Sequence, residues 1–139
     1  MGDGRAAPAR RLTTSPELFV ADLDRSIAFY ARFGLTVARR WEDWARLVHP
    51  AGAGIVLQGD AHAVAGPHYF TPHIGRVPRG TGVEITIEVP EVDDLHALAV
   101  REGLGVVKGL VDRPWGARDF RVADPDGYFV RFTTPLRDR

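Results

Sequence analysis

The sequence contains no cysteine among its 139 residues. Disulfide bridges, thiolate nucleophiles and cysteine-based metal sites are therefore excluded. The 18 basic and 18 acidic residues balance, which argues against nucleic acid or a membrane surface as a partner held mainly by long-range electrostatics. No apolar run approaches the length of a membrane span, and the first residues lack the apolar core of a secretion signal. We therefore expect a cytoplasmic protein.

One segment of the chain occurs twice. Residues 20–37 read VADLDRSIAFYARFGLTV, and residues 89–106 read VPEVDDLHALAVREGLGV. Aligned without a gap at an offset of 69 residues, the copies match at Val20 and Val89, Asp24 and Asp93, Ala28 and Ala97, Arg32 and Arg101, Gly34 and Gly103, Leu35 and Leu104, and Val37 and Val106. This repeat predicts two copies of one structural module.

The repeated segment has the pattern of a helix that follows a strand. Asp22 or Asp24 can cap the first turn by accepting hydrogen bonds from its free amides. Gly34 stands where a helix often ends in a left-handed residue. Helical spacing predicts a buried stripe made of Leu23, Ile27, Tyr30 and Ala31.

Alternation of apolar and polar residues predicts the strands around these helices. They span residues 12–20, 37–41, 44–49 and 54–58 in the first copy, and 83–89, 106–111, 119–123 and 128–134 in the second. The last two strands are joined by the turn Asp-Pro-Asp-Gly at 124–127, where proline and glycine suit a type I turn. Each copy is thus predicted to be β-α-β-β-β.

The domain organisation follows from this repeat. Residues 1–11 are small, polar or arginine and are predicted to form a flexible tail. Residues 12–139 are predicted to form a single domain, with module one at 12–60, a linker at 61–82 and module two at 83–135. A linker of this length is usually either functional or disordered.

These patterns resemble the vicinal oxygen chelate superfamily, which includes glyoxalase I, bleomycin resistance proteins and extradiol dioxygenases. The most specific pieces are VADLDRSIAFY at 20–30, the gapless repeat, and RPWGARDFRVADPDGYFVRF at 113–132. The resemblance covers residues 13–135. It implies an α+β fold in which two tandem βαβββ modules form curved mixed sheets around a cleft, usually in a homodimer.

In the metal-dependent branch of the superfamily, the first and last strands of each module supply one metal ligand apiece. The resemblance puts Ser15, Gln58, Glu84 and Arg131 at these positions. A divalent ion needs several carboxylates or imidazoles, whereas this set has one carboxylate and a guanidinium that stays protonated. We therefore expect no metal, no cofactor and neither glyoxalase I nor extradiol dioxygenase activity.

The family's sheet order implies that Glu84 and Arg131 are cross-strand neighbours that pair with each other. One interpretation makes them a structural ion pair between two strands. The other makes Arg131 face an anionic or carbonyl group of a ligand, since strand alternation places it on one face with Phe129.

Aromatic residues are the second candidate feature. In the bleomycin resistance branch, aromatic side chains of the corresponding hairpin line a crevice that stacks a planar drug. Strand alternation groups Trp44 with Arg46, away from the apolar residues of the other face. For Trp41 and Trp115, packing in the core or in a dimer interface is the competing interpretation.

The linker carries the segment PHYFTPH at 67–73. It is interpreted as a solvated loop packed by its own aromatic residues, or as a lid that contacts a ligand. A third interpretation gives its histidines a metal-binding or catalytic role, because histidine titrates near neutral pH.

The leading interpretation is a bacterial antibiotic-resistance-type protein that sequesters a planar or aromatic ligand in the cleft of a homodimer, without turnover. Its cleft arginines fit cationic bleomycin poorly. The candidate ligand-binding residues are Ser15, Glu17, Phe19, Trp44, Arg46, Gln58, His68, Tyr69, Phe70, His73, Glu84, Trp115, Phe129 and Arg131. No catalytic residue and no metal ligand is assigned.

Two alternatives remain open. One is a lyase-, isomerase- or dioxygenase-like enzyme of the same superfamily that uses Glu84 or a linker histidine, with a non-standard metal site. The other is a scaffold or regulatory protein whose cleft is filled by side chains.

Overall fold

The computed structural model describes residues 14–50, 52–66, 68–76 and 79–136, so the predicted tail at 1–11 lies outside the described residues. The first module contains β1 (Glu17–Val20), α1 (Leu23–Arg32), β2 (Thr36–Trp41), β3 (Trp44–Val48) and β4 (Gly54–Gly59). The second contains β5 (Glu84–Glu88), α3 (Val92–Arg101), β6 (Val106–Arg113), β7 (Ala117–Ala123) and β8 (Phe129–Pro135). Between them lie α2 (Asp60–Ala65) and the 3₁₀ turn η1 (Thr71–His73).

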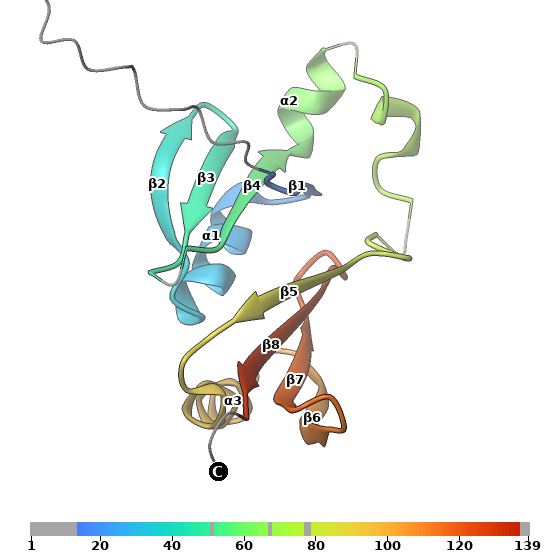
Figure 1. The fold of residues 1–139 in the computed structure, drawn as a ribbon. Helices are drawn as coiled ribbons and strands as arrows, with labels where there is room; N and C mark the ends of the chain where they lie inside the picture. The colour runs from blue at the N-terminus through green and yellow to red at the C-terminus, as the bar shows by residue number, and fades with distance from the viewer. Residues whose placement is uncertain (1–13, 51, 67, 77–78, 137–139) are drawn as a thin grey trace, which may run out of the picture.

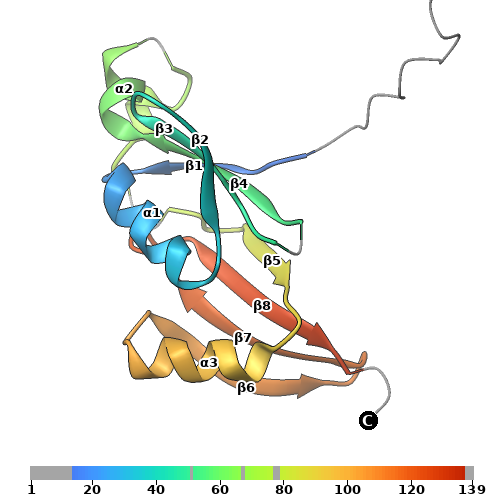
Figure 2. The same ribbon diagram turned by 90° about the vertical axis from the view of Figure 1, so that its left-hand side faces the viewer.

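The two modules have the same topology, which confirms the predicted α+β fold. Their strand orders are β1-β4-β3-β2 and β5-β8-β7-β6, and in each sheet the first two strands listed are parallel while the other pairs are antiparallel. Helix α1 packs on one face of the first sheet and α3 on one face of the second (Figures 1 and 2). None of the described helices is both long and apolar enough to cross a lipid bilayer.

Helix α1 begins and ends as its sequence predicts. The Asp22 side chain accepts a hydrogen bond from the Arg25 amide at 3.0 Å, and Gly34 has a φ of +87°. The predicted buried stripe is wrong at Ala31, which is exposed. Ser26 is fully buried instead, and its hydroxyl is satisfied there by donating to Asp126 Oδ2 of the second module at 3.3 Å.

Two segments differ from the sequence-based expectation. Strand β1 begins only at Glu17, after Pro16, whose backbone has no N–H to donate. Its carbonyl still accepts from the Val56 amide at 2.9 Å. The linker region, expected without regular structure, contains the short helix α2 and η1.

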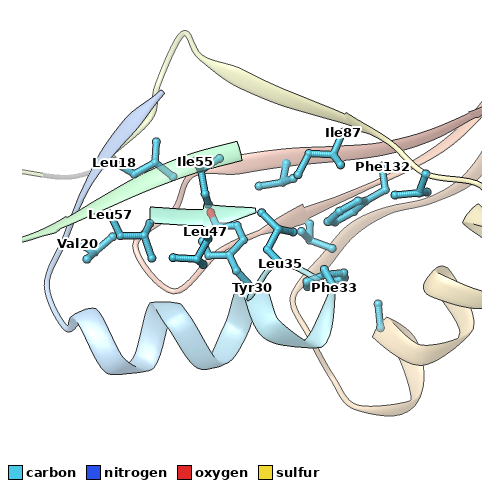
Figure 3. Packing of buried hydrophobic residues seen from close by; sticks show 14 of the residues in the cluster. Leu18, Val20, Tyr30, Phe33, Leu35, Leu47, Ile55, Leu57, Ile87 and Phe132 are labelled. Atoms are coloured by element: carbon cyan, nitrogen blue, oxygen red, sulfur yellow. The ribbon is translucent and has the colours of Figure 1, made fainter. Parts of the chain in front are cut away.

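The hydrophobic core is shared between the modules (Figure 3). Phe33, just after α1, stacks on Phe132 of β8 with ring centroids 4.6 Å apart and an interplanar angle of 18°. Phe132 also stacks on Phe120 of β7 at 5.5 Å. All three rings are buried, and each aromatic pair contributes about 0.5–1.5 kcal/mol beyond its buried area. These rings therefore join the cores of the two modules.

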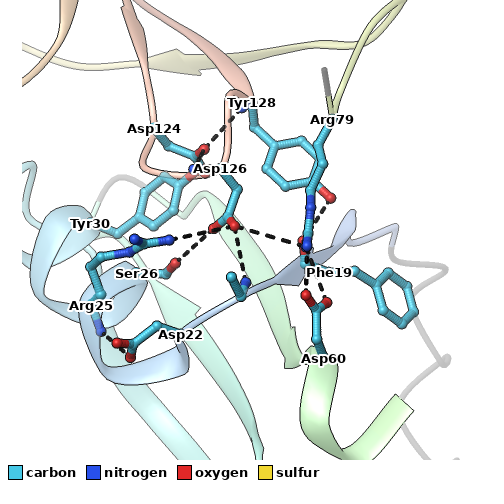
Figure 4. Close-up of polar contacts among 11 residues, drawn as sticks. Phe19, Asp22, Arg25, Ser26, Tyr30, Asp60, Arg79, Asp124, Asp126 and Tyr128 are labelled. Atoms are coloured by element: carbon cyan, nitrogen blue, oxygen red, sulfur yellow. Dashed lines mark hydrogen bonds and ion pairs between the residues drawn. The ribbon is translucent and has the colours of Figure 1, made fainter. Parts of the chain in front are cut away.

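Polar contacts made by the turn at residues 124–127 join the second module to α1 (Figure 4). The Tyr30 hydroxyl donates to Asp124 Oδ2 at 2.6 Å. The amide of Ala21 donates to Asp126 Oδ1 at 3.0 Å. Asp124 Oδ1 in turn accepts from the backbone amides of Asp126 and Tyr128, each at 2.9 Å. We call this set of contacts the Asp124 turn contact.

Burial is the main cause of the pKa shifts at the Asp124 turn contact. Desolvation raises the pKa of Asp124 above its ordinary value, although its hydrogen bonds with Tyr30 and the two backbone amides oppose that change. Burial, with the neighbouring Asp124 carboxylate as a second cause, raises the pKa of the Tyr30 phenol far above its usual range. Tyr30 therefore remains a hydrogen-bond donor at every accessible pH.

The first prediction concerns Tyr30. Tyr30→Phe leaves a buried oxygen of Asp124 without its donor, so it should lower the free energy of unfolding by about 1–3 kcal/mol. Urea denaturation with an unchanged m-value measures this loss. Tyr128→Phe is the matched control: its hydroxyl donates to the Phe19 carbonyl from a less buried position, and we expect about 0.5–1.5 kcal/mol. A loss in Tyr128→Phe that exceeds the loss in Tyr30→Phe would contradict this assignment.

The second prediction is a pH dependence that comes from Asp124. A carboxyl whose pKa is raised on folding stabilises the fold fully below its unfolded pKa, and this contribution is lost as the pH rises through the folded pKa. Over the range from acid to neutral pH, the wild type should therefore lose stability relative to Asp124→Asn as the Asp124 carboxyl ionises. Urea denaturation of both proteins across this range measures the difference. A difference that does not change with pH would contradict the assignment.

Candidate functional site

The face of the first sheet opposite α1 carries two rows of paired side chains. One row crosses the sheet through Phe19, Gln58, Trp44 and Trp41, and the next through Glu17, Val56, Arg46 and Arg39. Strand alternation puts these residues on the face opposite the buried Leu18, Ala45, Leu47 and Leu57. We call this surface the first open face.

A hollow of about 470 Å³ lies at the β2–β3 end of the first open face. It is lined by Arg39, Trp41, Glu42, Asp43, Trp44, Gln58 and His62. The Trp41 side chain is 64% exposed, so its ring is available to a ligand. The Gln58 amide nitrogen donates to the Asp43 carbonyl at 3.0 Å, which fixes this side chain at the floor of the hollow.

The acidic residues of the β2–β3 turn point toward α2. Asp43 Oδ2 accepts from the His62 amide in the first turn of the helix at 3.2 Å, and Glu42 lies 3.6 Å from the His62 imidazole. Glycine at position 59 makes room for this arrangement, since a Cβ there would stand 2.0 Å from the Asp43 carboxylate. Asp43 thus supplies the capping acceptor that Gly59 lacks.

The linker packs against the other end of the first open face. The Phe19 ring lies 4.7 Å from the ring of His68 and 5.4 Å from that of Phe70. A second hollow, of about 370 Å³, is lined by Glu17, Phe19, Phe70, His73, Ile74, Gly75, Arg79, Gly80, Thr81, Val83 and Tyr128. Tyr69 is 83% exposed. The linker residues His68 and Phe70 therefore contact the first open face, and their rings also contact each other with centroids 5.4 Å apart.

Arg79 and Tyr128 anchor this end of the linker to β1. The Arg79 guanidinium donates to the Phe19 carbonyl at 2.7 Å and to both carboxylate oxygens of Asp60. The hydrogen bonds with Asp60 raise the pKa of Arg79. Burial raises the pKa of the Tyr128 phenol, which donates to the same Phe19 carbonyl at 2.9 Å. Hydrogen-bonded polar groups of Arg79 and Tyr128 therefore form one wall of the second hollow.

On the second sheet, the predicted pair between Glu84 and Arg131 is wrong. Glu84 lies opposite Phe129 in the parallel register, and Arg131 lies opposite Thr86. The Glu84 carboxylate accepts instead from Arg121, while Arg131 donates to Thr86 Oγ1 at 3.0 and 3.3 Å.

The second sheet has a hollow of its own, of about 490 Å³. It is lined by Glu88, Trp115, Gly116, Ala117, Arg131, Thr133, Pro135 and Leu136. Trp115 is 66% exposed, and the Arg113 guanidinium lies 5.7 Å from its ring centroid. We call this surface, with Glu84 and Phe129 on it, the second open face.

The predicted ligand-binding residues thus fall into two groups within one chain. Ser15 is exposed and precedes β1. The first open face and the linker hold Glu17, Phe19, Trp44, Arg46, Gln58, His68, Tyr69, Phe70 and His73, and the second open face holds Glu84, Trp115, Phe129 and Arg131. The sequence reasoning missed Arg39, whose facing depends on a bulge in β2, and His62, which lies on the unpredicted α2.

The four family ligand positions do not fit a metal ion. Ser15 lies outside the strand, the Gln58 amide nitrogen is bound to backbone carbonyls, and Glu84 is paired with Arg121. The remaining position holds a cation, which repels a metal ion. Across the part of the chain that the structure describes, no three acidic or histidine side chains are grouped to hold an ion.

Comparison with known proteins supports the fold and places the chain in a family. The family model of the Glyoxalase/Bleomycin resistance protein/Dioxygenase superfamily matches residues 12–132. The chain belongs to this superfamily. An uncharacterized protein of Mycobacterium tuberculosis is 32% identical over 131 residues, which cover 89% of this chain and 75% of that protein. A Mycobacterium bovis protein has the same identity over 84% of its length.

Solved structures of the superfamily have the same fold. A glyoxalase/bleomycin resistance protein/dioxygenase from Nocardioides has a TM-score of 0.70 and 23% identity, over 96% of this chain and 89% of that one. A bleomycin-binding protein in complex with bleomycin has a TM-score of 0.61 and 17% identity, over 89% of this chain and 98% of that one. The bleomycin resistance determinant of transposon Tn5 has a TM-score of 0.65 and 17% identity, over 90% and 98%.

The third prediction tests the contact between Gly59 and Asp43 beside the 470 Å³ hollow. Gly59→Ala should displace the Asp43 carboxylate and remove the cap of α2, at a cost of about 0.5–2 kcal/mol in unfolding free energy. Asp43→Ala should cost a similar amount, and the double variant should cost little more than either one. Gly54→Ala on the same strand is the control, because its Cβ would meet only the Leu47 carbonyl at 3.6 Å. Additive losses would contradict the shared contact.

Proposed function

We propose that the protein binds and sequesters a small planar or aromatic molecule, without turnover and without a metal ion. The observation that carries this proposal is the pair of Trp41 and Trp44, opposite each other on the first open face beside the 470 Å³ hollow. Aromatic faces supply large contact area at low conformational cost, and stacking adds about 0.5–1.5 kcal/mol per ring pair. Superfamily structures that bind or resist bleomycin support a small-molecule role.

The proposal includes a homodimer. Each chain exposes two separate faces, and each face holds part of the predicted ligand-binding set. A two-fold axis can place the first open face of one chain opposite the second open face of its partner, which creates two identical clefts. Such a dimer would bring Trp44 and Gln58 near Arg131 and Trp115 of the partner subunit. We propose this assembly in the cytoplasm of a bacterium, with antibiotic resistance as its biological role.

The fourth prediction uses the three tryptophans of the chain. Planar natural products such as phenazines and quinolines, titrated individually, should include a ligand that quenches tryptophan fluorescence. Trp115→Phe leaves the pair on the first open face and should still be quenched. Trp41→Leu with Trp44→Leu should weaken binding by about 1–3 kcal/mol, the sum of two stacking contacts. Absence of quenching by every compound would contradict the proposal.

Turnover is tested on the same samples. The ligand that binds should be recovered chemically unchanged by mass spectrometry after prolonged incubation with the protein. A product that accumulates beyond one molecule per chain would favour the enzyme alternative over sequestration.

A further inference from the structure

On the first open face, the β2–β3 hairpin carries two neighbouring cross-strand pairs, each made of two identical residues. Trp41 lies opposite Trp44, and Arg39 lies opposite Arg46. Arg40, between the two pairs, points to the other face, where its guanidinium contacts Asp24 at 2.7 Å. A bulge between Val37 and Arg39 sets this register. The hairpin thus presents a cross-strand pair of indole rings next to a cross-strand pair of guanidinium groups.

Two arginines directly opposite each other are unfavourable in an isolated sheet, because like charges in a cross-strand pair repel. Neither Arg39 nor Arg46 has a carboxylate partner among residues 14–50, 52–66, 68–76 and 79–136. On the second sheet, the arginines at 113, 118 and 121 each contact at least one carboxylate within 4 Å, whereas Arg131, opposite Arg121, donates to the Thr86 hydroxyl.

The acidic residues near the hairpin do not neutralise this pair. Glu42 and Asp43 point toward His62 and the start of α2. Glu17 is in the same row as the arginines, but β4 separates β1 from β3, a distance of about 9–10 Å across two strand spacings. The guanidinium groups keep their charge at any working pH. The two groups therefore form a cationic surface beside the aromatic pair.

We propose that this hairpin recognises a planar aromatic anion, whose acidic group binds Arg39 and Arg46 while its ring stacks on Trp41 and Trp44. This inference rests on the proposed function and narrows its ligand class to aromatic acids. Guanidinium groups bind carboxylate, sulfonate or phosphate oxygens through charge-assisted hydrogen bonds. Successive residues on one face of a strand are about 7 Å apart, which a small aromatic acid spans. The same charge disfavours a cationic drug.

The fifth prediction compares two probes of nearly equal shape, 2-naphthoate and 2-naphthamide, by isothermal titration calorimetry. The anionic probe should bind about tenfold more tightly than the neutral one at low salt, and added salt should reduce the difference. Arg39→Gln and Arg46→Gln should each reduce this preference, and the double variant should abolish it. Trp41→Leu with Trp44→Leu should weaken both probes alike.

Arg40→Gln is the matched control, because Arg40 is on the same strand and faces α1. It should keep the preference for the anion. Arg39→Gln and Arg46→Gln should also raise the midpoint of thermal unfolding at low salt, because each removes the repulsion between the two guanidinium groups. A cooperative transition at this higher temperature shows that the variants are folded.

Equal affinity of the wild type for the two probes would overturn this inference while leaving the proposed function standing. A preference that survives in the double arginine variant would also overturn it. If neither probe binds while another planar compound quenches tryptophan fluorescence, this inference fails and the proposed function stands; if no compound binds, both fail.

Discussion

The hydrogen bond between Tyr30 and Asp124 determines how the two modules are joined. It ties the helix of the first module to the last turn of the second, at a fully buried phenol. Around it, Asp126 accepts from the amide of Ala21 and the hydroxyl of Ser26. The stacked rings of Phe33 and Phe132 complete the contact. The turn between β7 and β8 therefore also joins the two modules through polar contacts.

The contact between the modules leaves one face of each sheet open. Because α1 and the shared core occupy one face of the first sheet, the opposite face carries the side chains that can meet a ligand. The second sheet repeats this division, with α3 on its covered face. The hollows on these two faces, of about 470 and 490 Å³, combine exposed indoles with arginine. The proposed binding of a small planar molecule depends on these two surfaces.

Much of the fold can be predicted from the sequence, because its signals are local. The cap at Asp22, the glycine at the end of α1 and the alternation in β3 each act within a few residues. The buried Ser26 could not be found in this way, since its partner Asp126 lies 100 residues away in the sequence. The ion pair of Glu84 with Arg121 could not be predicted for a related reason. The parallel pairing of β5 with β8 has no connecting turn that fixes its register.

In the candidate site too, only residues placed by local sequence signals could be predicted. Trp44 and Arg46 could be assigned to one face by strand alternation alone. Arg39 and His62 could not, because a bulge and an unpredicted helix bring them to the hollow. The repeat predicted two modules, but only the arrangement of the sheets shows that the predicted ligand-binding residues lie on two faces of one chain.

A crystal structure of the protein grown with 2-naphthoate tests the central claim most directly. We expect the naphthalene ring to lie against Trp41 and Trp44, with the carboxylate within hydrogen-bond distance of Arg39 or Arg46. A hairpin buried against a partner subunit with no ligand on it, or a metal ion coordinated beside Glu84, would contradict it.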